Sequence, residues 1–132
     1  MFLDASGLLC ILDRREPSHV EAVTYLSASP HGMTHTAVIF ELVALAESRG
    51  LLRQVVLDFI AGLHANPAVD VFQLNEQDDW DALDLLQSRT DKSWSLCDAV
   101  SFNLMQDRGL ALTTDHHFEQ AGFVRLLTSL TT

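Results

Sequence analysis

The sequence predicts an α/β fold, in which helices cover both faces of a mostly parallel sheet of about five short strands. Short apolar runs of strand length alternate along the chain with longer segments of helical spacing. The runs are apolar throughout, as expected where both faces of a parallel sheet are covered. Apolar residues make up 48% of the 132 residues, enough for one such domain over residues 1–132.

The first half of the chain is expected to contain two strands and four helices. A short apolar run that ends at Asp4 indicates the first strand, and Pro17 is typical of the first turn of a helix. Thr36 is a candidate N-cap for a helix that Gly50 would close at C′. The expected segments are a strand at 1–3, helices at 8–12 and from 17, a strand at 33–36, and helices at 37–49 and 51–64.

The second half is expected to contain three strands and two helices. Asn75 and the acidic residues after it indicate a helix start, because carboxylates complement the helix dipole there. Ser95 is a candidate N-cap for the second helix, which ends before Gly109. The expected segments are a strand at 69–74, helices at 75–88 and 96–107, and strands at 110–113 and 124–127.

The charge balance restricts how the chain meets a polyanion. The net charge is -10, with 18 acidic residues against 8 basic ones, which counts against tight and non-specific nucleic-acid binding. Acidic residues around a cation can still serve nucleic-acid chemistry, because the cation inverts the local charge. The charge therefore leaves two interpretations open, namely no nucleic acid at all, or phosphate engaged through a metal.

The two cysteines and the first residues of the chain indicate the cellular compartment. Cys10 and Cys97 lie far apart without CxxC spacing, which is typical of thiols packed as small hydrophobes in a reducing cytosol. The chain opens without a basic segment and reaches Asp4 almost at once, unlike a signal peptide. We therefore expect a soluble, cytoplasmic protein.

Three acidic residues interrupt apolar runs, namely Asp4, Glu41 and Asp98. A lone carboxylate in apolar surroundings costs several kcal/mol unless it is paired, protonated or bound to a metal. Basic residues near them in the sequence are scarce, so we expect one divalent cation to neutralise several carboxylates together. Asp115 is the fourth candidate, because it follows the fourth strand as Asp4 follows the first, and ligands of parallel sheets gather at the carboxyl ends of strands.

The ligand types select the metal. Carboxylates without a matching set of His or Cys suit hard cations, so we expect Mg²⁺ or Mn²⁺. His116 and His117 are adjacent and lack the spacing of a zinc pair, so we interpret them as surface groups or as groups that support the ligands.

Four short motifs occur in order along nearly the whole chain. They are Asp4-Ala5-Ser6, Thr36 with Glu41-Leu42, the segment from Ser95 through Asp98 to Phe102, and the segment from Thr113 through Asp115 to Phe123. Together they resemble the PIN domain (the PilT N-terminus nuclease fold), and within it the VapC-type toxins.

The resemblance implies a Rossmann-like, three-layer α/β/α sandwich whose acidic cluster binds Mg²⁺ or Mn²⁺ and cleaves RNA. Matched by position, Asp4, Glu41, Asp98 and Asp115 take the catalytic and metal-binding places. Ser6 and Thr114 take the small polar places that hydrogen-bond around these acids, and Ser95 either caps its helix or joins them. We expect Asp4 and Asp98 to be direct ligands, with Glu41 and Asp115 completing the site or holding metal-bound water.

The resemblance also implies partners, namely an RNA substrate, a second copy of the chain and, for a toxin, a small antitoxin protein. Arg89 and Lys92 precede Ser95 and are candidate phosphate contacts, although ordinary surface charge is the alternative. Trp94 is a candidate for stacking on a base or for packing.

Other functions remain open. A PIN nuclease that processes RNA without being a toxin fits the same residues. So does a catalytically silent interaction module that holds a metal for structure. A phosphoacceptor signalling domain fits less well, because it expects an acidic pair after the first strand and a late Lys, whereas no Lys follows Lys92.

Overall fold

Five strands form one sheet in the computed structural model, which describes residues 1–106 and 109–128. The strands lie in the order β3-β2-β1-β4-β5, and every neighbouring pair is parallel. They are β1 (Phe2–Leu3), β2 (Gly32–His35), β3 (Val69–Phe72), β4 (Leu110–Leu112) and β5 (Val124–Arg125). The α/β fold with a parallel sheet that the sequence predicts is confirmed.

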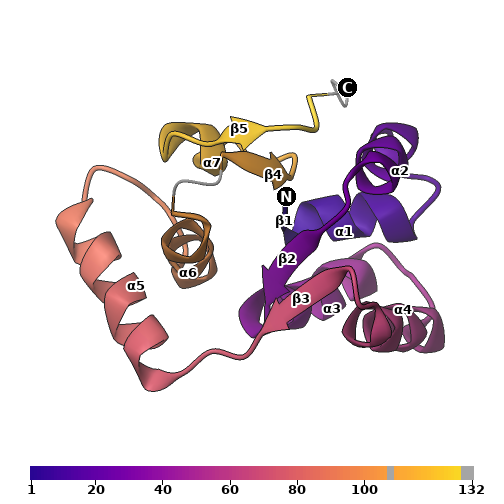
Figure 1. The fold of residues 1–132 in the computed structure, drawn as a ribbon, viewed down its shortest axis with the longest axis horizontal. Helices are drawn as coiled ribbons and strands as arrows, with labels where there is room; N and C mark the ends of the chain where they lie inside the picture. The colour runs from indigo at the N-terminus through magenta and orange to yellow at the C-terminus, as the bar shows by residue number, and fades with distance from the viewer. Residues whose placement is uncertain (107–108, 129–132) are drawn as a thin grey trace.

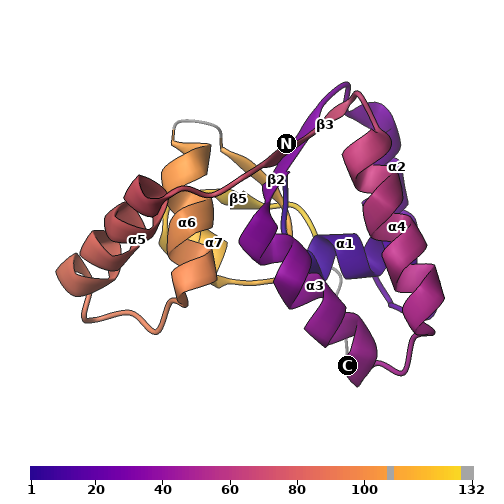
Figure 2. The ribbon, with the colours of Figure 1, turned by 90° about the horizontal axis from the view of Figure 1, so that it is seen from below.

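Helices cover the sheet from two sides. In Figure 2, α5 and α6 lie on one side of the strands and α1 to α4 on the other, and α1 packs against both α2 and α3. The helices are α1 (Ala5–Leu12), α2 (His19–Ala28), α3 (Thr36–Ser48), α4 (Arg53–Ala65), α5 (Glu76–Ser88), α6 (Leu96–Met105) and α7 (His117–Gln120). This is the three-layer arrangement (Figure 1). None of the described helices combines the length and the apolar character that crossing a membrane requires.

The central strand β1 is buried between these layers. Phe2 and Leu3 are almost fully buried, and so are Leu42 of α3 and Leu112 of the neighbouring strand β4. Burying a Leu or Phe side chain stabilises the fold by about 1.5–3 kcal/mol, so this core holds the carboxyl ends of β1 and β4 in place.

Helix starts differ from the predicted ones near the N-terminus. Helix α1 begins at Ala5 rather than at residue 8, with Asp4 as its extended N-cap residue. Helix α2 begins at His19, after the turn that contains Pro17. Val20 of this helix is 75% exposed, and Ala22 is its buried residue. Spacing alone did not show which face of this helix is covered.

The cap of α3 is His35 and not Thr36. The His35 ring accepts from the N–H of Val38, whereas the Thr36 hydroxyl donates to the carbonyl of Phe72 and accepts from the N–H of Leu74. Thr36 thus fixes the chain beyond β3, which ends at Phe72 rather than at residue 74. Gly50 at the C′ position has φ of 74°, as predicted for the end of this helix.

The remaining elements match within a few residues. Helix α4 covers Arg53–Ala65, and α5 begins after the capping residue Asn75 as predicted. Helix α6 ends at Met105, and residue 107, its predicted end, lies outside the described residues. Strands β4 and β5 end at Leu112 and Arg125, earlier than predicted.

Gly7 sets the distance between α1 and the sheet. A Cβ atom built on Gly7 would overlap the backbone carbonyl of Leu112 in β4. That carbonyl accepts from the N–H of Asp4, so the close approach of α1 also positions Asp4. Any larger residue would push α1 away from β4.

We predict that Gly7→Ala destabilises the fold by about 1–3 kcal/mol or more, because the overlap involves backbone rather than a flexible side chain. Urea unfolding measures the change. Gly62→Ala in α4 is the control, since a Cβ there meets nothing, and it should stabilise by up to about 1 kcal/mol. Equal stability of Gly7→Ala and the wild type would contradict the close packing of α1 on β4.

Candidate metal centre

The sheet order brings Asp4 next to the end of β4. Strands β1 and β4 are neighbours in parallel register, with Leu3 paired to Leu112. Asp4 and Thr113 each follow their paired residue at the carboxyl edge of the sheet. The Thr113 hydroxyl donates a hydrogen bond of 2.8 Å to the Asp4 carboxylate, and the Ser6 hydroxyl lies 3.4 Å from the same oxygen.

The Asp4 carboxyl group is the most perturbed acid at this edge. Asp4 is only 5% exposed. Burial raises its pKa to about 7, and the negative charges of Glu41 and Asp98 add to the rise, while the Thr113 hydrogen bond opposes it. Asp4 therefore lies close enough to Glu41 and Asp98 for both negative charges to raise its pKa.

Asp13 shows what a buried acid with a cationic partner looks like in the same chain. It is also 5% exposed, and it accepts two hydrogen bonds of 3.0 Å from the Arg15 side chain. The Arg15 guanidinium lowers the pKa of Asp13. Asp4 has no such ion pair among the described residues, and its pKa moves the opposite way. Asp4 thus differs from Asp13 because it is buried without a cationic partner among the described residues.

Glu41 reaches the site from α3, but it is exposed and not buried. The sequence argument that Glu41 is a lone carboxylate inside an apolar face is therefore wrong. Helix α3 is apolar nearly all round, and Phe40 beside Glu41 is itself 71% exposed. Glu41 still acts on its neighbours: burial raises the pKa of the Cys97 thiol in α6, and the adjacent Glu41 carboxylate raises it further.

Asp98 is held at the first turn of α6 by two interactions. It forms a capping box with Ser95, in which the Ser95 hydroxyl accepts from the Asp98 N–H and Asp98 Oδ2 accepts from the Ser95 N–H, each at 3.0 Å. Asp98 Oδ2 also lies 3.0 Å from Nδ1 of His117. Ser95 therefore both caps α6 and holds the Asp98 carboxylate.

Asp115 is fixed by the turn between β4 and α7. Its N–H donates to the Thr113 hydroxyl, and its carboxylate accepts from the His117 N–H at 2.9 Å. His117 Nδ1 lies 3.5 Å from Asp115 Oδ1 and 3.0 Å from Asp98 Oδ2. His117 thus joins Asp98 of α6 to Asp115.

Thr113 is the residue at this edge that the sequence reasoning missed. Its hydroxyl donates to Asp4 and accepts from Asp115, and it lies 3.0 Å from the Ser6 hydroxyl. Thr114 takes part through its backbone N–H, which donates to Ser6. Only the pairing of β1 with β4 makes Thr113 the neighbour of Asp4, and that pairing is not readable from the sequence.

A buried histidine braces α6 against the sheet. His35 at the end of β2 is fully buried, and its Nε2 lies 2.8 Å from the Ser101 hydroxyl of α6. Burial lowers the pKa of His35 to about 4, so the ring is neutral. Because Nδ1 accepts from Val38, Nε2 carries the proton and donates to Ser101, which donates to the carbonyl of Cys97.

The candidate phosphate contacts from the sequence are engaged elsewhere. Arg89 and Lys92 both pair with Asp91, and the Arg89 guanidinium lies over the Trp94 ring at 5.1 Å. Trp94 is 7% exposed, donates to Gln120 and packs edge-on against Phe102. Trp94 is therefore a packing residue and is not open for stacking on a base.

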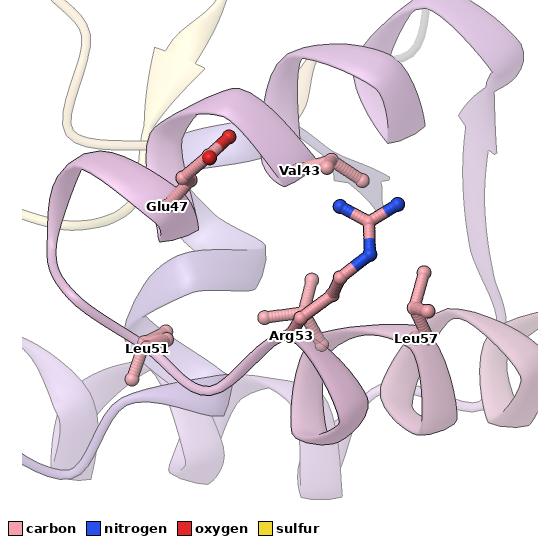
Figure 3. A pocket seen from close by; sticks show the side chains of 6 residues that line it. Val43, Glu47, Leu51, Arg53 and Leu57 are labelled. Atoms are coloured by element: carbon pink, nitrogen blue, oxygen red, sulfur yellow. The ribbon is translucent and has the colours of Figure 1, made fainter.

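A cavity of about 360 Å³ adjoins the acidic site. It shares Ser6 and Thr114 with the site and contains the basic residues Arg49 and Arg125. A separate pocket of about 160 Å³ lies between α3 and α4, where Arg53 points toward the space beside Val43 and Leu57 (Figure 3). Neither of these two cavities is lined by any of the four candidate acids.

A parallel α/β sheet with carboxylates at the carboxyl ends of β1 and β4 defines the class of domain. The model of the PIN domain family matches residues 1–124, and this chain belongs to that family. Its fold is similar to the crystal structure of VapC20 of Mycobacterium tuberculosis, described as a toxin that cleaves the sarcin-ricin loop. The two share 24% sequence identity with a TM-score of 0.82, over 93% of this chain and 95% of that one. No curated protein matches the chain.

We predict that Asp4→Asn stabilises the metal-free protein at pH 8 but not at pH 4. Below pH 4 Asp4 is neutral in both states, whereas between pH 4 and 7 it ionises only in the unfolded state, so wild-type stability falls over this window. A pKa near 7 in the fold corresponds to a gain of at most about 4 kcal/mol for the variant.

Urea unfolding in EDTA at both pH values measures this difference. Asp84→Asn, at an exposed position of α5, controls for the substitution itself. If Asp4→Asn is no more stable than the wild type at pH 8, Asp4 is not an uncompensated buried carboxyl.

Proposed function

We propose that this chain is a metal-dependent endoribonuclease that hydrolyses RNA phosphodiester bonds, working as one nuclease domain over residues 1–132. The observation that carries the proposal is the Asp4 carboxyl, which is buried without a cationic partner among the described residues and lies near Glu41 and Asp98. Membership of the PIN domain family supports the same function.

The residues at this edge fit a divalent cation. Several carboxylates close together cannot all ionise without a counter-charge. Burial is the main cause of the raised pKa of Asp4, and the charges of Glu41 and Asp98 add to it. Oxygen ligands of this kind suit Mg²⁺ or Mn²⁺. Asp4 and Asp98 would hold the cation, with Glu41 and Asp115 completing the site.

The chain's own residues prepare the site. Thr113 orients Asp4, Ser95 orients Asp98, and the His117 N–H orients Asp115. A bound Mg²⁺ or Mn²⁺ would supply polarisation of the phosphoryl oxygen and stabilisation of the leaving oxygen. The adjoining cavity is lined by Arg49 and Arg125. Arg49 pairs with Glu16 and Arg125 with Glu119, so a phosphate of the RNA backbone would contact these arginines by replacing their carboxylate partners.

We further propose that the nuclease is the toxin of a toxin–antitoxin pair, with RNA as substrate, a small antitoxin protein as partner and a homodimer as the working form. The fold of the VapC20 toxin supports this assignment. Large exposed apolar side chains flank the acids, with Phe40 at 71% next to Glu41 and Leu96 at 55% two residues before Asp98. Such side chains suit a surface that another protein covers.

We predict that Asp4→Asn and Asp98→Asn each lower the cleavage rate by at least about 100-fold, because several kcal/mol of transition-state stabilisation depend on the cation they hold. The assay incubates the protein with structured RNAs, including a sarcin-ricin loop oligonucleotide, in Mg²⁺, in Mn²⁺ and in EDTA. EDTA should abolish cleavage by the wild type, and Asp84→Asn should cleave at the wild-type rate.

Metal-dependent cleavage by either Asn variant at the wild-type rate would overturn the assignment. Cleavage by the wild type that persists in EDTA would overturn the metal dependence. Growth arrest on expression that Asp4→Asn relieves distinguishes a toxin from a nuclease of RNA processing.

A further inference from the structure

Asp115, His116 and His117, here called the Asp115 cluster, each direct one ligand atom into the same small volume. Those three atoms all lie within 4.8 Å of one another. His117 Nδ1 lies 3.5 Å from Asp115 Oδ1, and His116 Nδ1 lies 3.7 Å from the same oxygen. The two imidazole rings lie with centroids 4.7 Å apart.

The two separations from Asp115 Oδ1, 3.5 Å to His117 Nδ1 and 3.7 Å to His116 Nδ1, are close to those of ligands that share one small cation. Ligand atoms about 2.1 Å from a tetrahedral Zn²⁺ lie roughly 3.4 Å from one another. Asp98 Oδ2 lies 3.0 Å from His117 Nδ1 and fixes the position of that ring. Two imidazoles and one carboxylate are a ligand set for Zn²⁺ and related transition metals, with water in the fourth position, whereas Mg²⁺ prefers oxygen alone.

The surroundings prepare the cluster and leave it accessible. The Asp115 carboxylate is held by the His117 N–H, and the Asp115 N–H is held by Thr113. Such outer hydrogen bonds orient metal ligands in proteins. The His116 side chain is 67% exposed and Asp115 is 31% exposed, so a cation can enter from solvent, while His117 and Asp98 form the buried side at 19% and 11%.

We propose that the Asp115 cluster forms a mixed imidazole–carboxylate site that binds Zn²⁺. The site goes beyond the nuclease function, because binding requires neither RNA nor cleavage. It shares Asp115 with the proposed Mg²⁺ site, so Zn²⁺ bound here competes with Mg²⁺ for that carboxylate. Zn²⁺ bound to the Asp115 cluster thereby inhibits the proposed Mg²⁺ site.

The test is a titration of EDTA-stripped protein with Zn²⁺ in competition with a chromophoric zinc chelator, without RNA. We expect about one Zn²⁺ per chain, and a loss of affinity of at least about 10-fold in both His116→Gln and His117→Gln. His64→Gln, on the exposed face of α4, is the matched control and should bind Zn²⁺ as the wild type does. Because His116 is exposed, its variant tests the site even if His117→Gln disturbs the position of Asp98.

Zinc affinity that neither histidine variant changes would overturn the proposal, as would the absence of Zn²⁺ binding by the wild type. The same titration in millimolar Mg²⁺ should show a weaker apparent zinc affinity, and an unchanged affinity would overturn the competition. If the RNA assay shows no cleavage while zinc binds through the histidines, the proposed function fails and this site remains.

Discussion

The Asp4 side chain is buried because of its position between β1 and α1. It follows directly after β1, the central strand of the sheet, and it is the N-cap residue of α1, which Gly7 allows to approach the Leu112 carbonyl closely. The carboxyl group therefore lies in the interior at the same edge where β4 ends, beside Thr113. Burial without a cation raises its pKa to about 7, and the fold can keep such a group only at a cost in stability. The negative charges of Glu41 in α3 and Asp98 in α6 increase that cost in stability. A carboxylate with a purely structural role would not need other acids beside it.

The local and the non-local parts of this fold differ in how far the sequence predicts them. The α/β class and the starts of α5 and α6 follow from residue patterns, because Asn75 and Ser95 act on their own helices. The burial of Glu41 was predicted wrongly, since an apolar helix such as α3 does not show which face is covered. The cap His35 was missed because histidine is an unusual N-cap, and its ring is placed by Ser101, 66 residues away.

The candidate site follows the same division. Asp4 and Asp98 stand out in the sequence because they interrupt apolar runs, and both prove buried. Thr113 and His117 do not stand out, because each acquires its neighbours only when β1 pairs with β4 and when α7 approaches α6. Adjacent histidines lack the spacing of a metal pair within a helix, but the turn after β4 directs both rings to Asp115. Loop geometry, which single-sequence patterns do not encode, decides these contacts.

We propose that the carboxylates around Asp4 hold a divalent cation. The most direct measurement is a crystal structure from crystals grown with Mn²⁺, with anomalous diffraction recorded at the manganese edge. We predict an anomalous peak in coordination contact with Asp4 and Asp98. At a saturating Mn²⁺ concentration, a map without a peak at these two carboxylates would contradict the account.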